Sequence, residues 1–188
     1  MARLGKRPVT IPDGVKISVV DGKVRAESGK GKMERDLFPF IEVSVEGNKL
    51  YVKNKVSEKE KKLFRKTEAF QGLIRKLIIN MTVGLTTGFE KVLEMNGVGY
   101  KAEAKGKKLI LNVGFSNPVE LDIPEGLSVE VLKNTILFIR GMDIEKLGNY
   151  AATIRRICPP EPYKGKGIRY RGEYVRHKAG KTGVGATQ

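Results

Sequence analysis

The residues of this chain that are best suited to chemistry lie together between positions 160 and 170. The stretch reads Pro160-Glu161-Pro162-Tyr163-Lys164-Gly165-Lys166-Gly167-Ile168-Arg169-Tyr170. Its lysines and its arginine supply cations for phosphate groups. Its tyrosines supply flat rings that stack on nucleobases or pack against sugars. Because its prolines lack a backbone N–H and fix φ, the stretch fits neither a helix nor a central strand. The alternative is a flexible basic tail without a partner.

The basic pattern continues toward the end of the chain. Between positions 164 and 181 seven cations accompany one carboxylate, Glu173, with tyrosines and glycines interleaved. Such a segment buries too little apolar surface to fold alone, so we expect residues 159–188 to form an extended tail that orders on a polyanion. Glycine lets the backbone approach a flat or charged surface. The residues of the tail that we predict to contact nucleic acid are Tyr163, Lys164, Gly165, Lys166, Gly167, Arg169, Arg171, Arg176, Lys178 and Lys181.

Two further groups extend this predicted interface. Arg155 and Arg156 lie at the end of a predicted helix that directly precedes the tail. The second group is a loop that contains Gly97, Gly99 and Lys101. This loop matches a dinucleotide-binding fingerprint loosely, but an alternating strand follows it where the fingerprint must open a helix. We therefore expect its glycines to mark a bend or a close approach of the backbone.

The composition of the chain limits the classes of partner that it is suited to bind. The 188 residues carry a net charge of +15, which is self-repulsive in a compact state and indicates a polyanionic partner. Nucleic acid and an anionic membrane surface are the two candidates. No run approaches the roughly 18 apolar residues that a spanning helix requires, and the N-terminus lacks the apolar region of a secretory signal. One cysteine and one histidine exclude an internal disulfide and a cage of cysteine and histidine ligands. These features predict a cytoplasmic protein.

Catalytic and cofactor motifs are not recognisable. Gly180-Lys181-Thr182 resembles the end of a phosphate-binding loop, but that loop requires glycine where Val175 stands and a helix afterwards. No histidine stands near a serine or cysteine to activate a nucleophile. We expect Cys158 to be buried on a helix stripe. The sequence thus predicts no enzyme activity, no cofactor, no metal and no small-molecule substrate.

The elements that must position the interface follow a duplicated plan. Residues 32–54 superpose on the sequence 86 positions later without a gap, so that apolar positions and turns coincide. Each copy reads as alternating strands followed by one amphipathic helix. The predicted fold class is α+β: two duplicated copies, each an antiparallel β-sheet with one α-helix packed on one face, plus the extended basic C-terminal tail. The predicted domains are residues 1–81, 82–158 and 159–188.

Helix signals locate the two helices. Ser57-Glu58-Lys59-Glu60 has the pattern of a capping box, and Asp143 is suited to cap the second helix. The predicted buried stripes are Leu63, Thr67, Phe70, Ile74, Leu77 and Met81 on the first helix, and Ile144, Leu147, Ala151, Ile154 and Cys158 on the second. Pro159 and Pro160 end the second helix.

Four segments in order resemble one family along the whole chain. They are the start at residues 3–15, the loop Asn96-Gly97-Val98-Gly99-Tyr100-Lys101, the stretch at 160–170, and Gly180-Lys181-Thr182-Gly183. Together they resemble the sixth protein of the large ribosomal subunit, bacterial type. The resemblance implies a structural constituent of that subunit near the base of the factor-binding stalk, with ribosomal RNA and neighbouring ribosomal proteins as partners. It also implies that the second copy and the tail carry the main RNA contacts. The family usually has a basic residue where Cys158 stands, so the resemblance supports no RNA contact there.

Several alternatives stay open. The first is a general basic RNA-binding or RNA-chaperone protein outside the ribosome. The second is an enzyme that holds a phosphorylated substrate with the basic tail, although a general base and a nucleophile are not recognisable. The third is a membrane-surface protein, which lacks a lipidation motif and a basic amphipathic segment. For the first copy, RNA and protein both stay open as partners.

Overall fold

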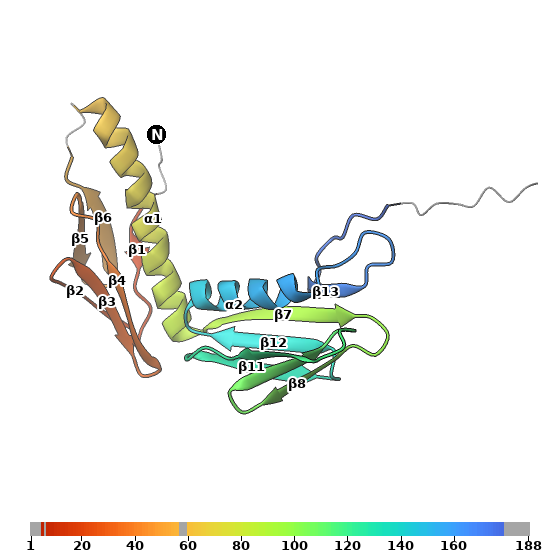
Figure 1. Ribbon diagram of the computed structural model, residues 1–188. Helices are drawn as coiled ribbons and strands as arrows, with labels where there is room; N and C mark the ends of the chain where they lie inside the picture. The colour runs from red at the N-terminus through yellow and green to blue at the C-terminus, as the bar shows by residue number, and fades with distance from the viewer. Residues whose placement is uncertain (1–4, 6, 57–59, 179–188) are drawn as a thin grey trace, which may run out of the picture. The chain divides into compact units, whose positions relative to one another are not determined.

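The alternating segments of the sequence form strands, and the two amphipathic segments form helices (Figure 1). The computed structural model describes residues 5, 7–56 and 60–178. The chain divides into two compact units, Met1–Phe89 and Glu90–Gln188. Figure 1 shows a helix lying along strands in each unit.

The described residues of unit 1 form two three-stranded antiparallel sheets and one helix. One sheet has the order β1-β6-β5 and the other has the order β2-β3-β4. The elements are β1 (Val9–Thr10), β2 (Lys16–Val20), β3 (Lys23–Ser28), β4 (Gly31–Asp36), β5 (Ile41–Glu46), β6 (Lys49–Asn54) and α1 (Lys61–Thr86). α1 contacts strands of both sheets, and buries Ile74, Ile78 and Met81 within unit 1. Removal of these side chains from water supplies the main stabilisation of the unit.

Unit 2 repeats this plan with one strand more. Its sheets have the orders β10-β9-β8 and β11-β12-β7-β13. The elements are β7 (Phe89–Asn96), β8 (Lys101–Lys105), β9 (Lys108–Asn112), β10 (Val119–Asp122), β11 (Leu127–Leu132), β12 (Ile136–Gly141), α2 (Ile144–Ile157) and β13 (Gly167–Tyr170). Leu147, Ala151 and Ile154 of α2 are fully buried, whereas Cys158 at its C-terminus is only half-buried. Asp143 caps α2 by accepting hydrogen bonds from the backbone N–H groups of Glu145 and Lys146, as the sequence predicted.

The duplication is visible in the backbone. β5 begins at Ile41 and β11 begins at Leu127, which is the predicted separation of 86 positions. The turn residues Gly47 and Lys133, which are also 86 positions apart, both have positive φ (58° and 52°). The sheet β1-β6-β5 corresponds to β7-β12-β11, so β13 is an addition to the common plan. These observations confirm the predicted class, an α+β fold of duplicated sheet–helix units.

One predicted domain boundary lies within a helix. The predicted end of the first copy at Met81 lies inside α1, because the buried face of that helix continues to Leu85. α1 begins at Lys61 with Glu60 as N-cap and no side-chain cap hydrogen bond, whereas the predicted capping box begins at Ser57. Ser57, Glu58 and Lys59 of that box lie outside the described residues.

Within residues 159–178, where the sequence predicts an extended tail, the chain folds back onto unit 2. β13 pairs antiparallel with β7, in the register Gly167↔Asn96 to Tyr170↔Leu93. Ile168 is fully buried, and its N–H donates to the Cys158 carbonyl at 2.7 Å. The prolines do not prevent this pairing, since they precede a short strand at the edge of the sheet. Residues 179–188 of the predicted tail lie outside the described residues.

Candidate nucleic-acid interface

Three backbone hydrogen bonds fold the basic segment back on itself. The N–H of Glu161 donates to the Lys166 carbonyl at 2.8 Å, and the N–H of Gly165 donates to the Glu161 carbonyl at 3.2 Å. The N–H of Lys178 donates to the Pro162 carbonyl at 2.8 Å. Residues 161–178, which we call the basic loop, therefore have a defined conformation that leaves the lysine side chains outside.

The backbone conformation favours glycine at both Gly165 and Gly167, and close packing also requires it at Gly167. Both are buried and have positive φ, 70° and 136°. A Cβ on Gly167 would lie 2.6 Å from the Pro159 carbonyl oxygen and 2.7 Å from the Pro160 Cα. The surface that Gly167 approaches is therefore the chain's own backbone at the end of α2.

One ion pair attaches the basic loop to α2. The Arg155 guanidinium donates to both oxygens of Glu173, with Nε–Oε2 3.0 Å and Nη2–Oε1 2.5 Å. The N–H of Tyr170 also donates to Glu173 Oε2 at 3.0 Å. The hydrogen bonds from Arg155 are the main reason that the pKa of Glu173 is lowered from its ordinary value. Arg155 was predicted to contact nucleic acid, but its guanidinium is engaged within the protein.

Glu94 of β7 engages two other predicted cations. Its oxygens lie 3.6 Å from Arg169 Nη2 and 3.5 Å from Arg171 Nε. The Nε of Arg169 is buried and has no hydrogen-bond partner among the described residues. Arg169 is about two-thirds buried, whereas Arg171 is mainly exposed. Their charge is thus partly neutralised within unit 2.

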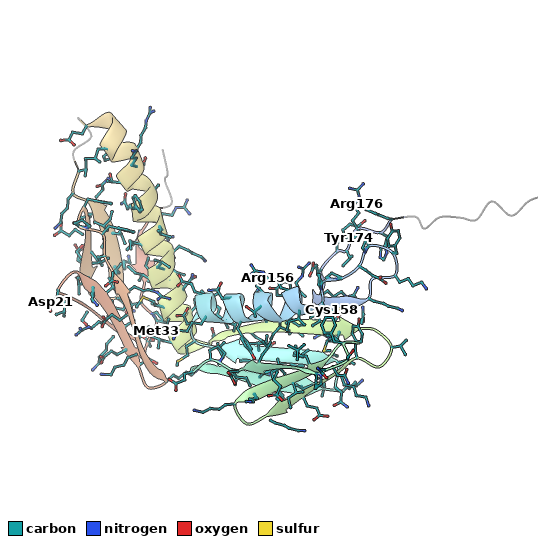
Figure 2. All side chains as sticks on the ribbon, in the orientation of Figure 1. Asp21, Met33, Arg156, Cys158, Tyr174 and Arg176 are labelled. Carbon is teal, nitrogen blue, oxygen red and sulfur yellow. The ribbon has the colours of Figure 1, made fainter. Side chains whose placement is uncertain are left out.

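Five of the predicted cations in the basic loop and at the end of α2 keep their side chains free of any ion pair with another described residue. All five are exposed, and they are Arg156, Lys164, Lys166, Arg176 and Lys178. Figure 2 shows Arg156 on α2, and Arg176 and Tyr174 on the basic loop. Tyr163 and Tyr174 are 57% and 87% exposed as whole residues, which favours stacking of a base on their rings. Lys181 lies outside the described residues.

The predicted second loop lies beside the basic loop. Asn96, which precedes Gly97, is the register partner of Gly167. The Tyr100 hydroxyl lies 3.6 Å from Cys158 Sγ, and this contact and burial raise the pKa of Tyr100. The two groups of predicted residues, far apart in sequence, therefore meet at one end of the β7–β13 pair.

Packing explains Gly97 in this second loop, and a positive φ explains Gly99. A Cβ on Gly97 would overlap the Tyr100 ring at 2.7 Å. Gly99 has a φ of 78° in open space, and Lys101 is exposed. Val98 between them is 94% exposed, which the site prediction did not include. Its position between two glycines in a turn was the signal for that exposure.

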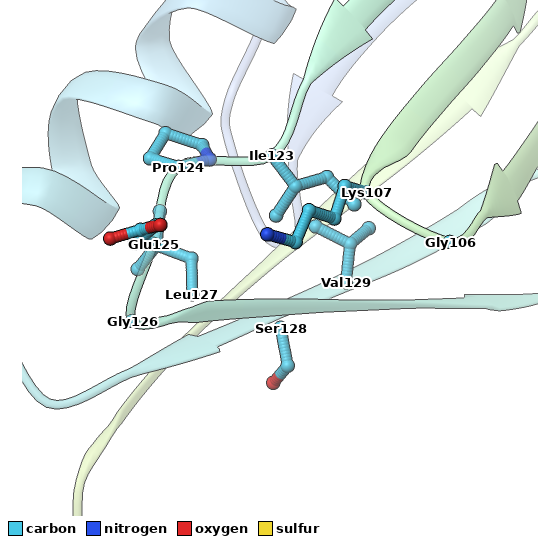
Figure 3. Close-up of a pocket in the computed structure, with 9 residues that line it drawn as sticks. All are labelled: Gly106, Lys107, Ile123, Pro124, Glu125, Gly126, Leu127, Ser128 and Val129. Carbon is cyan, nitrogen blue, oxygen red and sulfur yellow. The ribbon is translucent and has the colours of Figure 1, made fainter.

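Other features of the structure do not form a competing site. A hollow of about 430 Å³ is lined by Gly106, Lys107, Ile123, Pro124, Glu125, Gly126, Leu127, Ser128 and Val129 (Figure 3). None of the predicted site residues lines it. Within residues 5, 7–56 and 60–178 there is no group of three or more His, Cys, Asp or Glu side chains that could hold a metal ion. No helix in that part of the chain is long and apolar enough to cross a membrane.

The fold and the interface define a class of protein: a basic α+β protein with two sheet–helix units and a folded cationic loop on the second. The family Ribosomal protein L6 matches residues 96–171, which include that loop up to β13. Large ribosomal subunit protein uL6 of Desulfatibacillum aliphaticivorans is 48% identical over 184 residues, 98% of this chain and 100% of that protein. The same protein of Protochlamydia amoebophila is 50% identical over 181 residues, 96% of this chain and 97% of that protein.

This similarity covers both units, and not only the matched segment. The chain belongs to the family of large ribosomal subunit protein uL6. The family is a structural and non-enzymatic one, in agreement with the prediction from the sequence.

Proposed function

We propose that the chain is a structural constituent of the large ribosomal subunit and binds ribosomal RNA mainly through unit 2. Its relatives over nearly the full length are proteins of that subunit. The observation that carries the RNA contact is the basic loop, in which exposed cations without an ion pair to a described residue stand beside exposed tyrosine rings. Cations contact phosphates, and flat rings stack on bases.

The charge of unit 1 is arranged differently. On the sheet β2-β3-β4 the cations alternate with carboxylates across the strands. The ion pairs are Lys23–Glu34 (2.9 Å), Lys23–Asp36 (3.4 Å), Arg25–Glu34 (2.8 Å) and Lys32–Glu27 (2.9 Å). A face whose cations are paired presents little net field to a polyanion. This supports a role for unit 2 in selective binding, although unit 1 holds many of the cations of the chain.

The finer parts of the proposal follow from the family. The site of assembly would be near the base of the factor-binding stalk, in the cytoplasmic ribosome, with neighbouring ribosomal proteins as further partners. The mechanism requires no catalysis: a folded cationic loop neutralises phosphates that converge in one RNA tertiary arrangement, and so favours that arrangement over others. A general RNA-binding protein outside the ribosome would bind unrelated RNA equally well.

The test compares two pairs of lysines in unit 2. Lys164→Ala/Lys166→Ala removes two exposed cations of the basic loop. Lys105→Ala/Lys108→Ala removes the same charge from lysines that are paired with Glu103 and Glu120. Binding to a transcript of bacterial large-subunit ribosomal RNA is measured over a range of salt, with an unrelated RNA as competitor.

We expect only the basic-loop pair to change binding strongly. Each lost phosphate contact lowers the slope of log K against log salt by about 0.7–0.9, so the loss for two contacts is about 1.4–1.8. The preference over unrelated RNA should fall as well. Equal effects of the two pairs, or a wild type without preference for the ribosomal transcript, would contradict the proposal.

A further inference from the structure

Glu173 is the carboxylate around which the basic loop is assembled. It accepts two hydrogen bonds from Arg155 of α2 and one from the backbone N–H of Tyr170. The N–H of Glu173 in turn donates to the Tyr170 carbonyl at 3.0 Å. The Glu173 and Arg155 side chains are only 23% and 31% exposed, so water competes weakly for these bonds.

This arrangement ties the two ends of the basic segment together. Arg155 lies before the prolines that end α2, and Glu173 follows β13. The chain between them includes the β13 strand and the turn that presents Lys164 and Lys166. On the other side of β13, Glu94 of β7 holds Arg169 and Arg171. Two carboxylates therefore fix the loop to a helix and to a strand.

We propose that Glu173 is a positioning residue for RNA binding: its ion pair with Arg155 holds the basic loop in the conformation that binds, so that loss of this negative charge weakens binding to a polyanion. The inference rests on the proposed function. It concerns how the basic loop is held in its binding conformation, and not which groups contact RNA. A loop that is already ordered does not have to be ordered on binding.

Charge alone predicts the opposite effect. The basic loop is a cationic surface, and neutralisation of a carboxylate within it raises the positive potential that attracts phosphates. A Glu173→Gln variant should then bind RNA somewhat more tightly than the wild type. If Glu173 positions the loop, the same substitution lowers the population of the binding conformation and binding becomes weaker. The sign of the change therefore separates the two accounts.

A second carboxylate of the loop supplies the control. Glu161 lies in the same loop, and its side chain forms no hydrogen bond or ion pair with another described residue. Glu161→Gln therefore removes the same charge without breaking a side-chain attachment. Both variants and the wild type are titrated as full chains with the large-subunit ribosomal RNA transcript, at a temperature well below unfolding and at several salt concentrations.

We expect Glu173→Gln to weaken binding about tenfold, because bonds to charged groups have effects of that order. The slope of log K against log salt should not change, since the cations that reach phosphates are all retained. Glu161→Gln should bind as tightly as the wild type or more tightly. In the free protein, the amide protons of Ile168 and Lys178 should exchange faster in Glu173→Gln, while those of α2 keep their protection.

Binding of Glu173→Gln that equals or exceeds that of Glu161→Gln would overturn the inference. A general rise in exchange throughout unit 2 would also overturn it, because Glu173 would then merely stabilise the fold. These results are distinct from failure of the proposed function, in which the wild type itself shows no preference for the ribosomal transcript.

Discussion

Replacement of Gly167 by alanine tests whether close packing against Pro159 and Pro160 fixes β13. Gly167 has a φ of 136°, a conformation that residues with a Cβ rarely adopt, and this strain costs about 1–3 kcal/mol. The added Cβ would also lie 2.6–2.7 Å from three backbone atoms of Pro159 and Pro160. Backbone atoms cannot rotate away as a side chain can, so relief of this overlap costs about 1–3 kcal/mol more.

The expected loss of about 3 kcal/mol is a large part of the stability of a small domain. It corresponds to a fall in melting temperature of roughly 12–24 °C for a unit of this size. Gly172→Ala is the matched control, since Gly172 has a φ of 77° but a Cβ there would meet no atom within 4 Å. Only the conformational penalty of about 1 kcal/mol applies to Gly172→Ala, which corresponds to a fall in melting temperature of roughly 4–8 °C.

Tyrosine fluorescence provides the assay. Five of the six tyrosines lie in unit 2, and there is no tryptophan to obscure them. Thermal unfolding of the wild type and the two variants therefore reports mainly on unit 2. If Gly167→Ala melts within about 2 °C of Gly172→Ala, the contact with Pro159 and Pro160 does not fix β13, and our reasoning about this glycine is wrong.

Three further predictions concern unit 2. The lowered pKa of Glu173 means that the stability from its pair with Arg155 is present above the ordinary pKa and is lost as pH falls through the lowered one. The protection of amide protons in the basic loop, relative to their intrinsic exchange rates at each pH, should thus be constant from pH 7 to 5 and fall only below about pH 4.5, and in Glu173→Gln this acid dependence should disappear. Burial raises the pKa of Tyr150 to about 12, so stability should fall as pH rises from about 10 to 12, and Tyr150→Phe should make this fall clearly smaller in alkaline unfolding experiments. Lys133 and Asn134 form a turn with positive φ at both positions (52° and 57°), so Lys133→Gly should stabilise unit 2 by about 0.5–1 kcal/mol in urea unfolding.

The sequence predicted the parts of the fold that depend on local patterns. Alternation located the strands that pair with their neighbours in sequence, and the turn Asp21-Gly22 (φ 50° and 72°) forms as its residue types require. The strand β13 was not predicted, because its four residues carry one fully buried apolar side chain and pair with a strand some seventy positions earlier. Neither β-propensity nor hydrophobic periodicity indicates that two strands so far apart in the sequence pair with each other.

The same reason limits the prediction of the site. Residue types indicated which cations could meet phosphates, but not which of them are engaged within the protein. Arg155 is joined to Glu173 across 18 positions, and Arg169 is joined to Glu94 across a still longer separation. Only the tertiary structure distinguishes the cations that are exposed from those that are paired within the protein.

The late position of β13 in the chain has a consequence for biosynthesis. β7 is complete at Asn96, but the strand that pairs with its second half, from Leu93 to Asn96, begins only at Gly167. The strand of unit 1 that corresponds to β7 is β1. It has two residues and therefore few backbone groups at the edge of its sheet, whereas β7 has eight residues. Until the last part of the chain has emerged from the ribosome that makes it, β7 presents unpaired backbone groups to other nascent chains. The segment proposed to bind RNA in the finished subunit is thus also the one that ends this exposure.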